Sequence, residues 1–225
     1  MAGFNPQSFT ILGALEQNNT REWYEGNKKH LKEHVRQPFA GMLRLATMLL
    51  EGSTYPLRGS DKTMFRQNRD VRFSKDKTLY KTNVSGMLTP SGTKDEMGGV
   101  VYAQVGPRGG MIAAGYYQLA TAELNKVRDR MIADTAGFQD LLEGLAAKGY
   151  SLSPENTLKT MPRGYKQHEE HELAEALKLK GYTVRADAPP EEWLSGDIVE
   201  RIVSLAETIG PMNTWIRDAL TYEPQ

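Results

Sequence analysis

Residues 65–83 read FRQNRDVRFSKDKTLYKTN, and the rest of the chain is best understood as the framework around this stretch. Between residues 65 and 74 the side chains fall into two alternating sets, and successive side chains of a β-strand point to opposite faces. One set contains Phe65, Val71 and Phe73, whereas the other is entirely polar. The pattern therefore predicts a strand over residues 65–74 with one face on the core and the other in water.

The same stretch is strongly basic. Residues 58–81 contain eight Lys/Arg and three Asp, although the whole chain balances 28 Lys/Arg against 28 Asp/Glu. Arginine binds carboxylate or phosphate through paired hydrogen bonds, and lysine adds a compact charge. We therefore predict an anion site that is formed by the following residues: Arg66, Arg69, Asp70, Arg72, Ser74, Lys75, Lys77, Tyr80 and Lys81.

The alternative is an ion network in which Arg69 or Arg72 pairs with Asp70, Asp76 or more distant glutamates. Exposed pairs contribute only about 0–1 kcal/mol each, so stability alone is a weak reason to gather so many charges.

Four stretches resemble a known family. RDVRFSKDKTLYKTN (69–83) is similar to the hallmark of a bacterial and fungal family catalogued as domain of unknown function twenty-four sixty-one. The likeness extends to NNTREWYEGNKKHL (18–31), AAGYYQLATAELNKVRDRMI (113–132) and MPRGYKQHEEHELAEALKLKGY (161–182), in the right order along the chain. The resemblance implies proline where this chain has Leu79, so the loop is expected to be less rigid here. It also implies a single conserved domain, and it brings no established activity.

Length and composition are those of an ordinary globular protein. The 225 residues are 39% apolar and 25% charged, and no linker-like segment divides them, so we expect one domain over residues 1–225. There is no cysteine, which excludes disulfides and a thiolate nucleophile. The start MAGFNPQSFTIL lacks the pattern of a secretory signal, and the most apolar segment, 42–50, is too short to span a bilayer. We expect a cytoplasmic protein with no membrane partner.

Apolar periodicity predicts helices towards both ends of the chain. One helix should contain residues 9–15, and the next should begin after Asn19 or Thr20 and be ended or kinked by Pro38. An apolar stripe then runs from residue 39 to Leu49. Later helical patterns cover the ranges 120–131, 138–148 and 197–220, the last broken near Gly210-Pro211.

Four further short strands are predicted after the strand over residues 65–74. We predict strands over residues 83–88, 99–105 and 111–117, with a short edge strand over 182–186. Sequential strands with short links form antiparallel pairs. The sequence thus predicts an α+β fold, with a central, mainly antiparallel sheet of four or five strands packed by N- and C-terminal helices.

Other basic and aromatic residues extend the candidate site. Arg128 lies on the edge of a helix stripe, where it either joins the anion site or covers apolar surface with its stem. Lys159 and Arg163 lie in a turn-rich segment and are outside candidates for the same site. Three tyrosines either line a pocket beside the basic loop or are ordinary sheet aromatics: Tyr102, Tyr116 and Tyr117.

Two histidine groups have spacings that metals use. His30 and His34 are four residues apart but lack a third ligand nearby, so we interpret them as solvated or packed. His168, His171 and Glu172 would share a face at the start of a charged helix, where a solvated first turn is the simpler interpretation. We therefore predict no metal.

The motif search identifies no reaction. The chain has no P-loop, no GxGxxG, no GxSxG and no internal repeat, and Ser74 has no histidine nearby in sequence. We expect no cofactor, and the sequence leaves open whether the protein is an enzyme.

Three functions from different classes remain. The first is a basic cleft that binds a small phosphate- or carboxylate-bearing ligand. The second is a module whose basic strand and loop dock an acidic protein surface. The third is a nucleic-acid contact with Phe73 or Tyr80 stacked on bases, which zero net charge does not favour and which should weaken steeply with salt.

Overall fold

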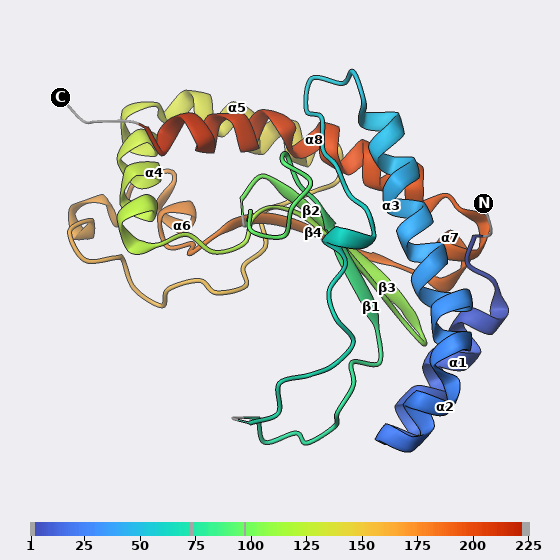
Figure 1. Cartoon of the computed structure of the whole chain (residues 1–225). Coiled ribbons are helices and arrows are strands. Elements are labelled where there is room, and N and C mark those ends of the chain that lie inside the picture. The colour runs from blue at the N-terminus through green and yellow to red at the C-terminus, as the bar shows by residue number, and fades with distance from the viewer. Residues whose placement is uncertain (1–2, 73, 97, 222–225) are drawn as a thin grey trace.

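The computed structural model describes residues 3–72, 74–96 and 98–221. Its centre is an antiparallel sheet in the order β1-β2-β3-β4 (Figure 1). The strands are β1 (Val84–Leu88), β2 (Val100–Gly106), β3 (Gly109–Tyr116) and β4 (Tyr182–Ala188). These elements confirm the predicted fold class and four of the predicted strands.

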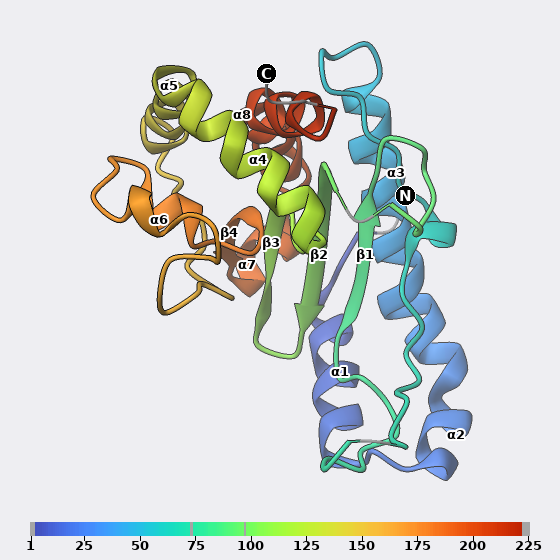
Figure 2. The ribbon, with the colours of Figure 1, turned by 90° about the vertical axis from the view of Figure 1, so that its left-hand side faces the viewer.

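Helices flank the sheet at both ends of the chain. They are α1 (Pro6–Gln17), α2 (Arg21–Leu31), α3 (Gln37–Leu50), α4 (Thr121–Ala133), α5 (Thr135–Ala146), α6 (Ala174–Leu177), α7 (Pro190–Ser195) and α8 (Ile198–Ala219). Four of them, α1, α3, α7 and α8, pack on one face of the sheet, and α4 and α5 pack on α8. Figure 2 shows the strands from the other side, where the lower half of the sheet carries no helix.

The core lies between the sheet and these helices. Phe4, Phe39 and Trp193 form an aromatic cluster that joins the N-terminal segment, α3 and α7, with ring centroids 5.5 to 6.4 Å apart. Each large side chain that is fully buried stabilises the fold by roughly 1.5–3 kcal/mol. The cluster therefore ties the two ends of the chain to one core.

The prediction of a strand over residues 65–74 is wrong, since the described residues of this range form no regular strand. Alternation is present, since Phe65, Gln67 and Arg69 are at least partly buried while Arg66 and Asn68 are exposed. No regular ladder forms, because the pairing is limited to the isolated bridges Met64↔Gly86 and Asn68↔Tyr80.

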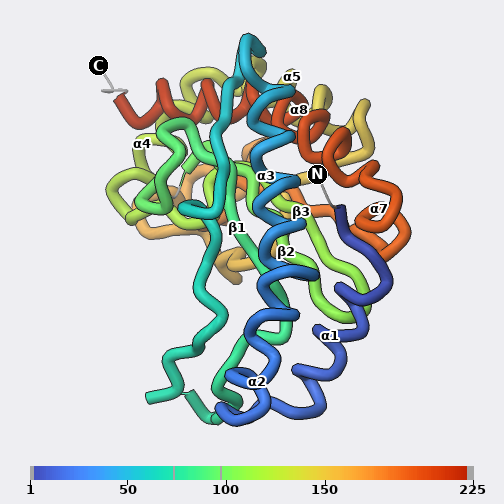
Figure 3. The backbone as a smooth tube through the Cα atoms, turned by 45° about the vertical axis from the view of Figure 1, so that its right-hand side comes forward, coloured from blue at the N-terminus to red at the C-terminus, as the bar shows by residue number. Residues whose placement is uncertain are grey.

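Two extra residues on one side explain the broken ladder. Four residue steps separate Met64 from Asn68, whereas six separate their partners Gly86 and Tyr80, so the second side has two extra residues. The Gln67 side chain fills the gap by donating to the carbonyls of Lys81 (2.7 Å) and Asn83 (3.0 Å). Residues 65–83, here called the arm, thus leave the sheet as an irregular hairpin, and Figures 1 and 3 show it extending beyond the end of β1. Phe73, predicted on the core face, lies outside the described residues.

The helices differ from the predictions in four details. A π-helical turn, Lys32–Arg36, joins α2 to α3, so Pro38, which was expected to end or kink the helix, does not end it. Leu49 is 51% exposed and Leu50 takes its buried place. Helix α8 continues through Pro211. No regular helix begins at residues 168–172, where a 3-10 turn and bends precede the short α6.

Both outer edges of the sheet carry other segments. Arg58 and Thr89 exchange backbone hydrogen bonds at the β1 edge, at 2.8 and 2.9 Å. At the β4 edge the Ser153 amide donates to Thr183 (2.7 Å), and the Leu158 amide donates to Lys178 (3.0 Å) just before the strand. The segment that contains Ser153 and Leu158 is thereby fixed beside β4.

No helix within the described residues combines the length and apolarity that crossing a bilayer requires.

Candidate functional site

Two arginines of the predicted site are already paired within the arm. Arg69 contacts Asp76 and Thr78, and Arg72 forms an ion pair with Asp70 at 2.6 Å. The hydrogen bond from Arg69, aided by the Thr78 amide, lowers the pKa of Asp76 to about 2, and the bond from Arg72 lowers the pKa of Asp70. The ion network considered as the alternative is therefore present at these two arginines.

The other predicted site residues of the arm are buried or half-buried, bonded to the backbone, or exposed. Tyr80 is buried and stacks on Tyr24 of α2, with ring centroids 3.8 Å apart, so its ring is not available to stack on a base. Lys77 donates to the Val71 carbonyl at 3.0 Å. Lys75 is exposed and Ser74 half-buried.

Positive charge nevertheless concentrates at the base of the arm. Lys81 is half-buried with its ammonium 5.5 Å from the Phe65 ring centroid. Burial, and then the nearby Arg66 and Arg69, lower the pKa of Lys81. Neither Lys81 nor Arg66 forms an ion pair with a residue that the structure describes, so both cations remain candidates for an external anion.

A second group of cations lines a pocket of about 590 Å³ between the start of α4 and the segment 156–163. We call it the cationic pocket. Its cationic members are Arg128, Arg163 and Lys180. Its other lining residues are Gln118, Leu119, Thr121, Leu124, Asn125, Asn156, Leu158 and Pro162. Of the described residues that line it, none is Asp or Glu.

Arg128 forms the buried wall of the cationic pocket, with only 2% of its surface exposed. Its guanidinium donates to the carbonyls of Leu177 (2.8 Å) and Leu179 (3.1 Å) and to Asn125 Oδ1 (3.2 Å). Burial lowers the pKa of Arg128, yet arginine keeps its charge in proteins. No carboxylate among the described residues forms an ion pair with it. Its charge is offset by these oxygen acceptors, by the Tyr165 ring, whose centroid lies 5.7 Å from the guanidinium carbon, and by the more distant Asp129.

The opposite wall is polar and more accessible. Arg163 and Lys180 are exposed, and neither forms an ion pair within the described part of the chain. Asn156 has a φ of 62°, and it is the one non-glycine residue with positive φ among those described. Such backbone conformations are uncommon and concentrate at functional sites.

The sequence singled out Arg128, Lys159 and Arg163 only as further candidates for the anion site of the arm. Arg128 and Arg163 line the cationic pocket, which contains no residue of the arm, and Lys159 does not line it. Lys180 and Asn156 were missed, since no local pattern distinguishes them from solvated residues. The backbone bonds of Ser153 and Leu158 to Thr183 and Lys178 place the segment that contains Asn156 beside Lys180, and the sequence did not predict this pairing.

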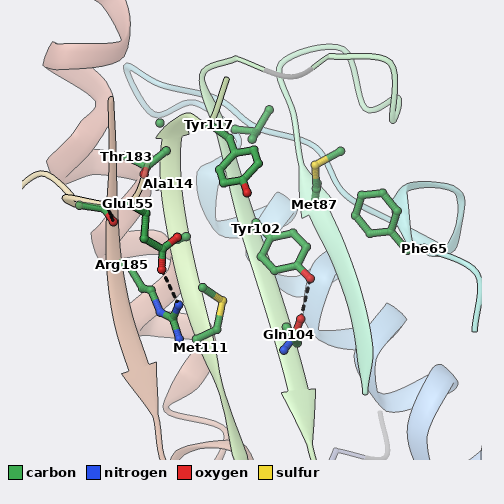
Figure 4. Close-up of a pocket in the computed structure, with 14 residues that line it drawn as sticks. Phe65, Met87, Tyr102, Gln104, Met111, Ala114, Tyr117, Glu155, Thr183 and Arg185 are labelled. Carbon is green, nitrogen blue, oxygen red and sulfur yellow. Dashed lines mark hydrogen bonds and ion pairs between the residues drawn. The ribbon is translucent and has the colours of Figure 1, made fainter. Parts of the chain in front are cut away.

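A separate groove of about 440 Å³ lies on the face of the sheet that the long helices leave uncovered (Figure 4). Tyr102 and Tyr117 line this groove, whereas Tyr116 is buried. Burial raises the pKa of Tyr102, which donates a hydrogen bond to Gln104 at 2.8 Å.

The histidines are engaged in packing and hydrogen bonds. The rings of His30 and His34 stack 5.9 Å apart. His171 accepts from the Leu173 amide through Nδ1 (3.1 Å), and Glu172 accepts from Gln139 (2.6 Å). Within residues 3–72, 74–96 and 98–221, no group of three or more His, Asp or Glu side chains is placed to hold a metal ion.

Comparison with known proteins gives one match. The family model described as conserved hypothetical protein (DUF2461) matches residues 7–215. No curated protein matches the chain.

Proposed function

Since the chain belongs to the conserved hypothetical protein family DUF2461, a description that names no activity, we propose a function from the geometry of the chain itself. The protein binds a small molecule through a phosphate or carboxylate group that is held in the cationic pocket.

One observation carries this proposal: of the described residues that line the pocket, three are cations and none is a carboxylate. An anion entering it meets Arg128, whose orientation is already fixed by three hydrogen bonds to the protein. Arg163 and Lys180 are exposed and can turn onto the ligand, Arg163 with a planar pair of donors and Lys180 with a point charge. The fixed wall reduces the ordering cost of binding.

The uncharged groups favour the same class of ligand. Asn125 uses its oxygen to accept from Arg128, which leaves its amide N–H groups for the pocket. Gln118 and Asn156 add side-chain amides, and Thr121 adds a hydroxyl. Hydrogen-bond donors therefore predominate, which suits an acceptor-rich group such as phosphate.

The test is a thermal-shift panel of inorganic phosphate, sugar phosphates, nucleotides and organic acids on wild type and Arg163→Ala. Losing one charged hydrogen-bond donor costs roughly 1.5–3 kcal/mol, so affinity should fall about ten- to a hundredfold in the variant. Lys159→Ala is the matched control, because Lys159 is an exposed cation on the same segment that does not line the pocket. An equal loss in both variants, or no stabilisation of wild type by any anion, would contradict the proposal.

The arm is a second candidate place for the anion. Support comes from the closeness of three cations: the pKa of Lys81 is lowered first by burial and then by the nearby Arg66 and Arg69, and an acidic group bound beside them would relieve that repulsion. In the same panel, a loss of binding in Lys81→Ala but not in Arg163→Ala would move the ligand to the arm. That ligand would then be either a small anion or the acidic surface of a partner.

A further inference from the structure

The uncovered face of the sheet is hollow because its third strand lacks bulk there. Ala113 and Gly115 of β3 form the floor, between Tyr102 of β2 and Arg185 of β4. Gly115 has a φ of 121°, and a Cβ at this position would lie 2.1 Å from the Tyr182 carbonyl oxygen. Only glycine fits, so the hollow is fixed by backbone geometry.

The walls of the groove are aromatic and thioether surfaces. Phe65 and Tyr102 lie 6.1 Å apart and are tilted by 51°, and Met87 and Met111 stand beside them (Figure 4). Tyr117 closes one end, with 49% of its surface exposed. Such surfaces bind the faces of flat rings, since aromatic and sulfur groups both pack well against them.

The charges of the groove cancel. Its charged lining residues are Arg185 and Glu155, which form an ion pair at 3.1 Å (Figure 4). Arg185 also lies 3.6 Å from Asp187, which does not line the groove. A charged ligand would have to break this pair or lie unpaired, so the groove suits a neutral molecule and differs in chemistry from the cationic pocket.

The polar groups of the groove include one hydrogen-bond donor without a partner among the described residues. Gln104 accepts from the Tyr102 hydroxyl through Oε1, and its amide nitrogen donates to no residue that the structure describes. Thr183 and Ser153 place hydroxyl-bearing side chains at the opposite side. A ligand with an acceptor, such as a ring nitrogen or carbonyl, at its edge would satisfy the Gln104 amide.

We propose that this groove is a second binding site, for a neutral, planar aromatic or heteroaromatic molecule that carries a hydrogen-bond acceptor on its edge. The volume of about 440 Å³ lies within the range of small-molecule sites. The proposal is independent of the anion site, because the two use different residues and ligands of different charge.

The experiment compares coumarin, a neutral fused ring with a carbonyl, with its saturated counterpart octahydrocoumarin, by saturation-transfer NMR and calorimetry. Wild type should bind coumarin at least tenfold more tightly than the saturated compound, because only the planar ring can lie on the floor of the groove. Ala113→Leu should abolish coumarin binding by filling that floor. Ala146→Leu, the same substitution at an exposed position of α5, should leave it unchanged.

Further variants keep the test decisive. If Ala113→Leu does not fold, Gln104→Met removes the amide donor at similar volume, and coumarin affinity should fall severalfold. Arg163→Ala should bind coumarin like wild type, which separates this proposal from the anion site. The proposal would be overturned if wild type did not bind coumarin or bound the saturated compound equally well. It would also be overturned if the protein formed a dimer in solution that Gln104→Met dissociates.

Discussion

Arg128 is a buried cation whose hydrogen bonds go to two backbone carbonyls and to Asn125 Oδ1, with no carboxylate among the described residues in an ion pair with it. Because its donors reach residues 177 and 179, it fixes α4 to the segment that precedes β4. The same contacts set one wall of the cationic pocket. A single residue therefore serves stability and, in our proposal, anion binding.

Replacing Arg128 with methionine should lower the free energy of unfolding by about 3 kcal/mol, since hydrogen bonds from a charged donor are lost and two buried carbonyls lose their partner. Urea unfolding measures the loss, and Lys159→Ala should unfold like wild type. A loss below about 0.5 kcal/mol would mean that Arg128 does not hold these segments together.

Asp76 predicts a pH dependence of the arm. Its pKa in the folded chain is about 2, below the ordinary value of 3.8. The stabilising contribution of a depressed carboxyl pKa is present above the ordinary value and is lost as the pH falls towards the folded value. The arm should therefore loosen between about pH 4 and pH 2, as reported by faster exchange of the Thr78 amide, which donates to Asp76.

Asp76→Asn provides the comparison for this measurement. The variant should show faster exchange already at neutral pH and little further change on acidification. A Thr78 amide whose exchange follows the same pH profile in both proteins would exclude Asp76 as the cause.

At the scale of elements, the sequence predicted most of the fold. Alternation and turn residues located β1 to β4, and Thr20 caps α2 as one of two expected residues. The arm was only half predicted, since its alternation is visible in sequence but the two-residue shift in pairing that breaks the ladder is not. Pairing depends on the partner strand, which a local pattern does not contain.

The arm is attached to the start of α2 by Asn19. Its side chain donates to the Tyr80 carbonyl and accepts from the Tyr80 amide, both at 2.9 Å. Asn19→Ala removes both bonds, each contributing roughly 0.5–1.5 kcal/mol, so the arm should detach about tenfold more often. Trypsin cleavage after Lys75 and Lys77 measures this opening.

Asn18→Ala is the matched control, because Asn18 is the exposed neighbour and bonds to α1 rather than to the arm. Cleavage should be accelerated by the Asn19 substitution and not by the Asn18 substitution. Equal cleavage rates in the two variants would show that the hydrogen bonds between Asn19 and Tyr80 do not hold the arm.

At the scale of the whole molecule, the candidate site was the harder part to predict. Arg128 and Arg163 could be recognised as cations, but the pocket that brings them to Lys180 forms from three separate parts of the chain. Similarly, the pairing of Arg69 and Arg72 with nearby aspartates was an open alternative in the sequence. The sequence shows which residues are charged, whereas tertiary packing decides which of them lie next to one another.

We expect the chain to unfold as one cooperative unit, because Trp193 packs on Phe4 and Phe39 across the two ends of the chain. Trp193→Ala should lower the free energy of unfolding by about 3–5 kcal/mol. Circular dichroism and protection of the arm from trypsin should then shift together to lower temperature.

Leu194→Ala, at an exposed neighbouring position, should leave both transitions in place. Two separate transitions in wild type, one for the arm side and one for the C-terminal helices, would contradict a single cooperative unit.

The segments along the outer edges of β1 and β4 have a consequence for the behaviour of the protein at high concentration. An edge strand whose backbone N–H and C=O groups are unpaired can pair with a strand of a neighbouring molecule, and such pairing starts fibrous aggregation. Here the backbone groups of Thr89 and Thr183 are already bonded within the chain. Protection against such aggregates is thus part of the native structure, and a truncation that strips residues 151–158 from β4 would remove it.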